Sequence, residues 1–356
     1  MEKGVSRALK EVLYSGFIGQ GEKVEEFERA LIPWVGRKTI LALNSCTSAL
    51  QLALRLSDVK AMDEVISTPV TCTATNTPIL ATGAKIVWAD VDPWTGNIDP
   101  ESVRKKITKK TKAVICVHWG GTPCDLSALG KMCQDHGLKL IEDAAHALGA
   151  GSLGEPVGSH GDFVCFSFQA IKPLTTGDGG LLSCKSAKDY ERGKLLRWYG
   201  IKRPADLKQD IPEWGYKFHM NDLAATIGLE NLKGLALDLR TRRENAHFFS
   251  GSYNPNSAYW FFPVIVKPKT RFMREMQQKG VSCSSVHERN DHYSMFKPFR
   301  VSLPGVDAFC ASQVNLPIGP WLTSQDKTTI QEALQAFRPS GQDALLTAFL
   351  KDALVR

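Results

Sequence analysis

Lys172 is the residue whose surroundings most clearly suggest chemistry. It follows an apolar run, Phe163 to Phe168, that is typical of a buried strand, and it enters a loop rich in Thr, Gly and Asp. The next charged residue along the chain is Asp178. Burial at such a position lowers the pKa of a lysine and makes its amine a nucleophile, as a Schiff base with an aldehyde cofactor requires. On this stretch alone, a surface lysine at a strand end is an equally good interpretation.

Two other places carry groups that suit the same chemistry. Asp143 ends a strand-like run, and a carboxylate there could hold a heteroaromatic nitrogen protonated, as a pyridoxal ring requires. Ser45, Thr47 and Ser48 cluster where a helix begins, and hydroxyls and free N–H groups at a helix start favour a phosphate. Simple N-capping explains one of these three residues. An isolated Lys, a strand-end Asp and a Ser/Thr-rich helix start together predict a site for pyridoxal 5′-phosphate (PLP).

The elements that position these residues alternate between strand and helix. Strands alternating with helices predict an α/β fold with a parallel sheet covered on both faces, and ligands bind beyond the carboxyl ends of its strands. The predicted strands are residues 39–43, 64–67, 84–90, 111–118, 139–143 and 163–168, with helices at 22–34, 45–56, 71–82, 101–107 and 125–136.

After residue 180 the alternation loosens, and from about residue 253 the order of a strand, a helix, and then a loop and short helices predicts a smaller α+β domain. We expect a returning strand at 181–184, a helix at 190–198, two long helices at 220–237 and 239–249, a strand at 260–266 and helices at 269–279 and 342–356. We place the domain boundary between residues 235 and 236. The large domain is then 1–235 and the C-terminal domain 236–356.

Composition excludes several classes of protein. The 356 residues are 43% hydrophobic and 23% charged, and no run approaches the roughly 18 apolar residues of a membrane span. The N-terminus lacks the apolar core of a secretory signal, which predicts a cytoplasmic protein with no membrane partner. Nine cysteines without paired spacing predict neither disulfides nor a metal site. The net charge of +7 is spread along the chain, which suits a small polyanion such as a nucleotide diphosphate better than nucleic acid.

A set of short motifs, in this order, resembles the DegT/StrS family of PLP-dependent sugar aminotransferases. The similarity runs from about residue 14 to residue 317. The motifs are Ser45-Cys-Thr-Ser-Ala-Leu50, Ile98-Asp-Pro100, Val117-His118, Glu142-Asp-Ala-Ala-His146, Ser167 to Lys172, Leu174-Thr-Thr-Gly-Asp-Gly-Gly180 and Gly215-Tyr216.

The resemblance implies the aspartate aminotransferase-like fold type I, with a mostly parallel seven-stranded sheet flanked by helices. It also implies a homodimer whose active sites are shared between the subunits. Lys172 would form the Schiff base with PLP, and Asp143 would face the pyridinium nitrogen. The other implied cofactor contacts are Cys46 and Thr47 through their backbone N–H groups, the Ser167 hydroxyl, Ala145 against one ring face and His146 near the 3′-hydroxyl.

The chain departs from the family pattern at several of these places. Cys46 stands where a glycine is usual, and Cys72 stands where an aromatic residue usually stacks on the ring. Lys217 and His219 occupy positions where relatives often carry Asn and Arg, and Lys217 could reach the phosphate of the partner subunit. The candidate substrate residues are His219, His287, Arg289 and Asn290, for which solvated surface charge is an alternative interpretation.

The function implied by the resemblance is amino transfer. L-Glutamate would donate its amine through pyridoxamine 5′-phosphate to a nucleotide-linked 4-keto- or 3-keto-deoxysugar, leaving 2-oxoglutarate. Three alternatives stay open: an aminotransferase for a cyclitol or other non-nucleotide ketone, a PLP-dependent sugar dehydratase and a non-catalytic family member. Dehydratases of this fold carry histidine in place of Lys172. Cys72, which replaces the stacking residue, favours a non-catalytic family member. The presence of Lys172, Asp143 and Ser167 argues against that alternative.

Overall fold

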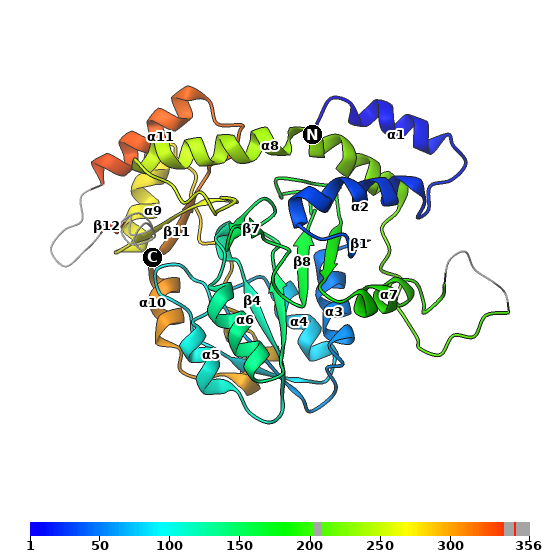
Figure 1. Ribbon diagram of the computed structural model, residues 1–356. Coiled ribbons are helices and arrows are strands. Elements are labelled where there is room, and N and C mark those ends of the chain that lie inside the picture. Colours follow the sequence, from blue (N-terminus) through cyan, green and yellow to red (C-terminus); the bar gives the residue numbers. More distant parts are fainter. Residues whose placement is uncertain (203–207, 338–344, 347–356) are drawn as a thin grey trace.

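The computed structural model describes residues 1–202, 208–337 and 345–346, and its centre is a seven-stranded sheet (Figure 1). The strand order is β1-β9-β8-β5-β4-β2-β3. Only β9 runs antiparallel to its neighbours, so the predicted parallel sheet and returning strand are confirmed. The strands are β1 (Ile40–Leu43), β2 (Glu64–Ser67), β3 (Lys85–Trp88), β4 (Thr111–Val117), β5 (Lys139–Asp143), β8 (Phe163–Ser167) and β9 (Gly180–Cys184).

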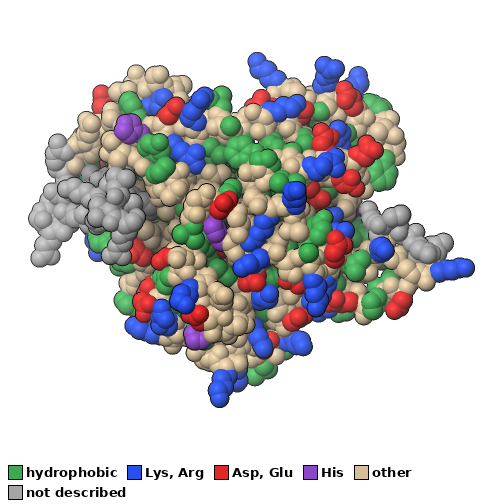
Figure 2. All heavy atoms as spheres, viewed as in Figure 1, with side chains coloured by type: hydrophobic (Ala, Val, Ile, Leu, Met, Phe, Trp, Pro, Cys, Tyr) green, Lys and Arg blue, Asp and Glu red, His purple; other side chains and the backbone are tan. Residues whose placement is uncertain are grey.

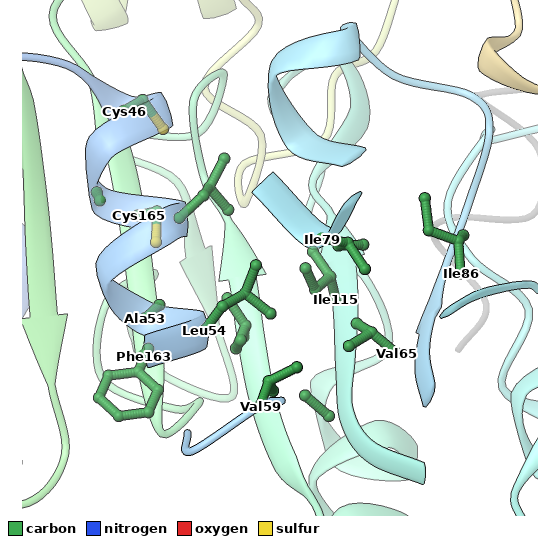
Figure 3. Packing of buried hydrophobic residues seen from close by; sticks show 14 of the residues in the cluster. Cys46, Ala53, Leu54, Val59, Val65, Ile79, Ile86, Ile115, Phe163 and Cys165 are labelled. Atoms are coloured by element: carbon green, nitrogen blue, oxygen red, sulfur yellow. The ribbon is translucent and has the colours of Figure 1, made fainter. Parts of the chain in front are cut away.

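Helices cover both faces of this sheet, which is why its strands are apolar throughout rather than alternating. In β8, Phe163 and Cys165 face one side, whereas Val164 and Phe166 face the other. Figure 3 shows the first side, where side chains of α3 meet those of β2 and β4. The helices α3 (Cys46–Leu56), α4 (Thr73–Ala81) and α7 (Ala187–Leu196) cover this side, and α2 (Glu22–Val35), α5 (Pro100–Lys106), α6 (Leu126–Asp135) and α8 (Asp222–Ser250) cover the other.

The long helix α8 corrects one prediction. We expected two helices separated near residue 238, but α8 is a single helix of 29 residues. Leu235 and Leu239 are both buried at helical spacing, and Asp238 pairs with Arg242 one turn later at 2.5 Å, so the helix continues through this point. It passes from α1 and α2 to α11 along the top of Figure 1. The predicted boundary at 235 and 236 falls inside α8, and the division into two domains stays a prediction.

The C-terminal part is built on a second, small sheet. It consists of β10 (Phe262–Val266), β11 (Gln313–Leu316) and β12 (Leu345–Leu346), all antiparallel. The helices α9 (Lys269–Gln278), α10 (Pro304–Ser312) and α11 (Ser324–Ala336) accompany it. Most of the predicted helix 342–356 lies outside the described residues, and its residues 345–346 belong to β12 instead.

Several elements were not predicted. They are α1 (Val5–Leu13), the hairpin of β6 (Gly151–Ser152) and β7 (Glu155–Pro156), and the short helix η1 (Trp119–Gly121). The short helices η2 (Asn290–His292) and η3 (Ser294–Phe299) lie where a loop and short helices were expected after residue 279. Among the described residues, no helix is long and apolar enough to cross a membrane. On the face in Figure 2, Lys and Arg side chains are interspersed with Asp and Glu rather than gathered into one basic patch.

Candidate active site

A cavity of about 390 Å³ lies at the carboxyl edge of the large sheet. It collects residues that follow β1, β2, β5 and β8, because the carboxyl ends of these strands share one edge. Its lining includes Ser45, Cys46, Thr47, Cys72, Asp143, Ala145, His146, Ser167, Lys172, Trp260 and His287. The structure thus brings the Lys, the Asp and the Ser/Thr-rich helix start into one site, as predicted.

Lys172 projects into this cavity from the loop between β8 and β9. Burial lowers the pKa of its amine to about 8, although the attraction of Asp143, Cys46 and Cys72 acts in the opposite direction. Its Nζ atom lies 3.7 Å from the centroid of the Trp260 ring. A lysine in this environment carries a substantial fraction of neutral amine near pH 8, which is the form that attacks an aldehyde.

Asp143 stands at the end of β5, where two donors hold its carboxylate. The Thr75 hydroxyl donates to Oδ2 at 2.6 Å, and the backbone N–H of Ala145 donates to Oδ1 at 3.0 Å. The Thr75 hydroxyl also lies 2.7 Å from that of Thr71. Burial raises the pKa of the Asp143 carboxyl, whereas these hydrogen bonds and Lys172 favour its ionised form. The carboxylate is therefore fixed in direction and kept from bulk water.

The start of α3 forms the phosphate-sized end of the cavity. Ser45 caps the helix by accepting a hydrogen bond from the Ser48 N–H at 3.0 Å, and it leaves Cys46 and Thr47 in the first turn, where backbone N–H groups have no intrahelical partner. Gly180 passes this turn so closely that a Cβ atom would lie 2.3 Å from the carbonyl carbon of Ser45. Residue 180 must therefore be glycine. At position 46, where the family usually has glycine, the cysteine fits in the first turn of α3.

Two histidines form another part of the lining. The rings of His146 and His287 are nearly parallel, at 5° with centroids 5.8 Å apart, and Nδ1 of His146 and Nε2 of His287 are buried without a hydrogen-bond partner. Burial and the nearby Lys172 charge lower the pKa of His146 well below its ordinary value and that of His287 to about 4. Both imidazoles are thus neutral near pH 7, and each has one buried nitrogen without a hydrogen-bond partner among the described residues.

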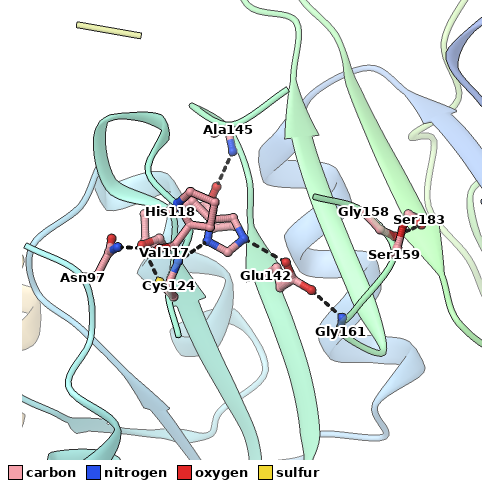
Figure 4. A network of polar contacts seen from close by, with 12 residues as sticks. Asn97, Val117, His118, Cys124, Glu142, Ala145, Gly158, Ser159, Gly161 and Ser183 are labelled. Carbon is pink, nitrogen blue, oxygen red and sulfur yellow. Dashed lines mark hydrogen bonds and ion pairs between the residues drawn. The ribbon is translucent and has the colours of Figure 1, made fainter. Parts of the chain in front are cut away.

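A buried polar network supports the strand ends beneath the cavity (Figure 4). His118 Nε2 lies 2.8 Å from Glu142 Oε2, and Glu142 also accepts a hydrogen bond from the N–H of Gly161. Because His118 Nδ1 accepts the N–H of Cys124 at 3.1 Å, the proton lies on Nε2. His118 lies within 4.8 Å of the Cys116 and Cys124 thiols, but both of its nitrogens are already engaged, so this cluster offers no histidine ligand for a metal.

Four other predicted site residues, all within the described part of the chain, are absent from the lining of this cavity: Arg289, Asn290, Lys217 and His219. The Arg289 guanidinium is paired with Asp291 at 2.7 Å and with Asp307. The Asn290 amide is buried and donates to the carbonyl oxygen of Thr71 at 2.7 Å. These contacts make both residues structural supports of the cavity, and their contact with substrate stays a prediction.

Lys217 and His219 lie on the strand-like segment that runs beside β1. The Lys217 carbonyl accepts a hydrogen bond from Asn44 Nδ2 at 3.3 Å, and its side chain is exposed. The His219 ring packs edge-on against Trp198, with centroids 4.1 Å apart. The contact of the exposed Lys217 with a partner subunit stays a prediction.

Sequence reasoning missed two residues at the site, Trp260 and Thr75. Trp260 stood in an apolar run that predicts a strand, and Thr75 stood inside a predicted helix. A Thr within one helical turn after the Cys72 position was the available signal for Thr75. No local signal pointed to Trp260, because its partner Lys172 lies 88 residues earlier in the chain.

Comparison with known proteins agrees with this geometry. The chain matches the DegT/DnrJ/EryC1/StrS aminotransferase family over residues 1–335. Among solved structures, AtS13 from Actinomadura melliaura is 40% identical with a TM-score of 0.91, covering 95% of this chain and 96% of that one. The sugar aminotransferase CalS13 from Micromonospora echinospora is 36% identical with a TM-score of 0.91, covering 95% and 98%.

A curated relative carries a named activity. The UDP-4-amino-4,6-dideoxy-N-acetyl-beta-L-altrosamine transaminase of Campylobacter jejuni (serotype O:23/36, strain 81-176) is 28% identical over 353 residues, covering 93% of this chain and 92% of the relative. The chain therefore belongs to the DegT/DnrJ/EryC1/StrS aminotransferase family, and its fold is the fold type I of PLP-dependent sugar aminotransferases. The predicted family, fold class and enzyme class are confirmed.

The residues of the cavity fit the cofactor of this family, which is PLP; solved structures of similar proteins include a PLP form and a PMP form. A lysine with lowered pKa, a fixed carboxylate, a helix start with available N–H groups and His146, whose Nδ1 has no hydrogen-bond partner, line the same cavity. Each is a partner that one part of PLP requires. Cys72 is exposed at the mouth of the cavity and provides no aromatic surface there.

Proposed function

We propose that this chain transfers the amino group of L-glutamate to a nucleotide-linked 4-keto- or 3-keto-deoxysugar in amino-sugar biosynthesis. The observation that carries the proposal is the meeting of Lys172 and Asp143 across one cavity in a member of a sugar aminotransferase family. The named activity of the Campylobacter relative, a transaminase of a UDP-linked sugar, supports a sugar nucleotide as the acceptor.

Lys172 is proposed to act twice in each half of the reaction. Its neutral amine would hold the cofactor between turnovers, and once a substrate has taken that place the free amine would carry a proton between the reacting substrate carbon and the C4′ atom of the cofactor. PLP, when bound, supplies an electron sink that stabilises negative charge at that carbon. The lowered pKa of Lys172, about 8, lets the same amine accept and return the proton near neutral pH.

The other residues are proposed to orient and polarise the cofactor. Asp143 would hold a proton on the ring nitrogen, an electrostatic effect that grows in the transition state. The N–H groups of Cys46 and Thr47, with the Ser167 hydroxyl, would bind the phosphate. Ala145 would lie against one ring face, and the neutral His146 would receive the 3′-hydroxyl.

The acceptor and the assembly complete the proposal. The open nitrogen of the neutral His287 would bind a hydroxyl of the sugar, with His219, Arg289 and Asn290 as further candidates. We propose a cytoplasmic homodimer with shared active sites, in which the exposed Lys217 reaches the phosphate bound by the partner subunit.

An isotope experiment tests both the donor and the acceptor. The protein loaded with PLP receives glutamate carrying ¹⁵N in its amine, with a keto-sugar nucleotide or, separately, a cyclitol ketone. We expect glutamate to abolish the visible absorbance of the lysine-bound cofactor and the label to appear in the sugar. Label in the cyclitol alone would overturn the substrate class, and unchanged absorbance with glutamate would overturn the donor.

Replacement of the reactive lysine gives the largest expected effect in this assay. Lys172→Ala removes the amine that binds the cofactor and carries the proton, so we expect no visible absorbance of a lysine-bound cofactor and no label in the product. Lys105→Ala, an exposed lysine at the end of α5, is the matched control and should behave as the parent protein. Label transfer by Lys172→Ala at the parent rate would contradict the assignment.

A further inference from the structure

Trp260 lies beside Lys172 although the two residues are far apart in the sequence. Lys172 Nζ is 3.7 Å from the centroid of the indole ring. The indole N–H donates a hydrogen bond to the carbonyl oxygen of Ile171 at 3.1 Å. The ring is therefore tied to the backbone of the residue that precedes the lysine.

Trp260 makes further contacts through its backbone and through its ring. Its N–H donates to the carbonyl oxygen of Gly120 at 3.0 Å, and its carbonyl accepts from Arg242 Nη1 at 3.0 Å. The indole stacks on the His146 ring, with centroids 3.8 Å apart and planes at 23°. A side chain fixed at its backbone, its ring and its N–H is a rigid support for a flexible lysine.

The indole face is also an electrostatic partner. An aromatic face attracts an ammonium group within about 6 Å, and Trp does so most strongly. The titratable groups around Nζ are Asp143, which attracts the ammonium, the thiols of Cys46 and Cys72, which would do so only as thiolates, and His146 and His287, whose pKa values burial and the Lys172 charge lower. Burial favours the neutral amine of Lys172. Trp260 and Asp143 stabilise its ammonium form and so oppose this effect of burial.

We propose that Trp260 is a positioning residue that holds the free, protonated amine of Lys172 at the reacting carbon. This rests on the proposed function, in which Lys172 is released from the cofactor when the substrate amine enters. In this step Nζ would take the proton from the substrate α-carbon and deliver it to the cofactor C4′ atom, while the cofactor ring would take up the electron pair left on the carbon, so the lysine ends unchanged. Without the contact with Trp260, the freed Lys172 side chain would sample several rotamers. Its amine would then lie close to the substrate carbon less often, and proton transfer would be slower.

The first test measures Lys172 without the cofactor. In the PLP-free protein, the pH dependence of Lys172 acetylation by limiting acetic anhydride, followed by mass spectrometry of the peptide, reports the pKa of its amine. Trp260→Phe keeps an aromatic face and Trp260→Leu removes it, while both stay apolar. We expect midpoints near about 8 for the parent protein and Trp260→Phe, and a lower midpoint for Trp260→Leu. A midpoint for Trp260→Leu at or above that of Trp260→Phe would overturn the proposal.

The second test measures the transfer of the proton. In a single turnover with glutamate, we expect Trp260→Leu to be slower by about tenfold and Trp260→Phe to stay close to the parent, with unchanged cofactor content and unfolding temperature. Equal rates in the Leu and Phe variants would contradict a role for the aromatic face. If Trp260→Leu does not fold, Trp260→Met replaces it as the apolar variant without a ring. If the parent itself does not react with glutamate, the donor in the proposed function is wrong, and the acetylation experiment alone decides the role of Trp260.

Discussion

The cavity around Lys172 has two walls of different construction. One wall consists of the strand ends of the large sheet and the start of α3, and its groups are held by hydrogen bonds, as Asp143 is by Thr75 and Ala145. The other wall consists of Trp260 and His287 from the C-terminal part of the chain, and it is held by ring stacking against His146. The first wall is polar and tied to the sheet, and the second is aromatic and rests on loops.

This difference separates two tasks. Neighbouring strands fix the first wall within fractions of an ångström, which suits a cofactor whose chemistry does not vary. The second wall depends on side-chain packing and on His287 in the left-handed backbone region at φ 60°, so it can change without disturbing the sheet. We therefore expect variants of the first wall to affect both half-reactions, as should those of Trp260, which lies against Lys172, and we expect variants at His287 to affect only the sugar.

Asp143→Asn should have the largest effect among the variants that compare the walls. Asparagine keeps the shape but loses the negative charge that holds the proton on the ring nitrogen. We expect the rate of the glutamate half-reaction to fall by about 10²–10³-fold, the size seen when an electrostatic partner of a transition state is removed. Stopped-flow absorbance measures this rate. Asp135→Asn, exposed on α6, is the control, and a fall of less than tenfold for Asp143→Asn would place the charge elsewhere.

Thr75→Val tests the support behind that carboxylate. The variant removes the hydroxyl that donates to Asp143 at 2.6 Å, a bond that favours the ionised form. Its loss should raise the pKa of Asp143 further, so at a given acidic pH less carboxylate is ionised and the acid side of the rate profile moves to higher pH. We expect the rate to fall by roughly tenfold at neutral pH. Thr77→Val, exposed on the same helix, should leave the profile in place.

The uptake of PLP by the cofactor-free protein should depend on pH through Lys172. Only the neutral amine attacks the aldehyde, and burial lowers the pKa of Lys172 to about 8. The rate should therefore rise as the pH increases through 8 and then level off, with a gain of about tenfold between pH 7 and pH 9. The growth of visible absorbance after mixing measures it. A rate that keeps rising towards pH 10.5 would show an unperturbed lysine.

His287→Asn should have the smallest effect and should separate the two walls. Asparagine tolerates the positive φ of this position but cannot present the imidazole nitrogen to the sugar. We expect KM for the sugar nucleotide to rise by about three- to tenfold, as for one neutral hydrogen bond, with the glutamate half-reaction unchanged. His292→Asn, exposed in η2, is the control. Equal loss in both half-reactions would show that His287 belongs to the cofactor wall.

The first wall could be predicted from local patterns in the sequence. Strand-to-helix alternation defines a parallel sheet, and a parallel sheet brings the residues after its strands to one edge whatever the details of packing. The positions of Asp143 and Lys172, and the capped start of α3, follow from this local pattern. The long helix α8 was the exception, because only the burial of Leu235 and Leu239 and the pairing of Asp238 with Arg242 show that the helix continues through residue 238.

The second wall could not be predicted from local patterns, because it forms where distant segments of the chain meet. Trp260 and His287 reach the cavity because β10 and the loop before η2 pack beside residues that lie more than a hundred positions earlier, such as Gly120 and His146. The sequence around Trp260 predicts an ordinary strand, and the sequence around His287 predicts an ordinary loop. The physical reason is that ring stacking and hydrogen bonds between distant segments depend on where the segments meet in space, which a local pattern of residue types does not encode.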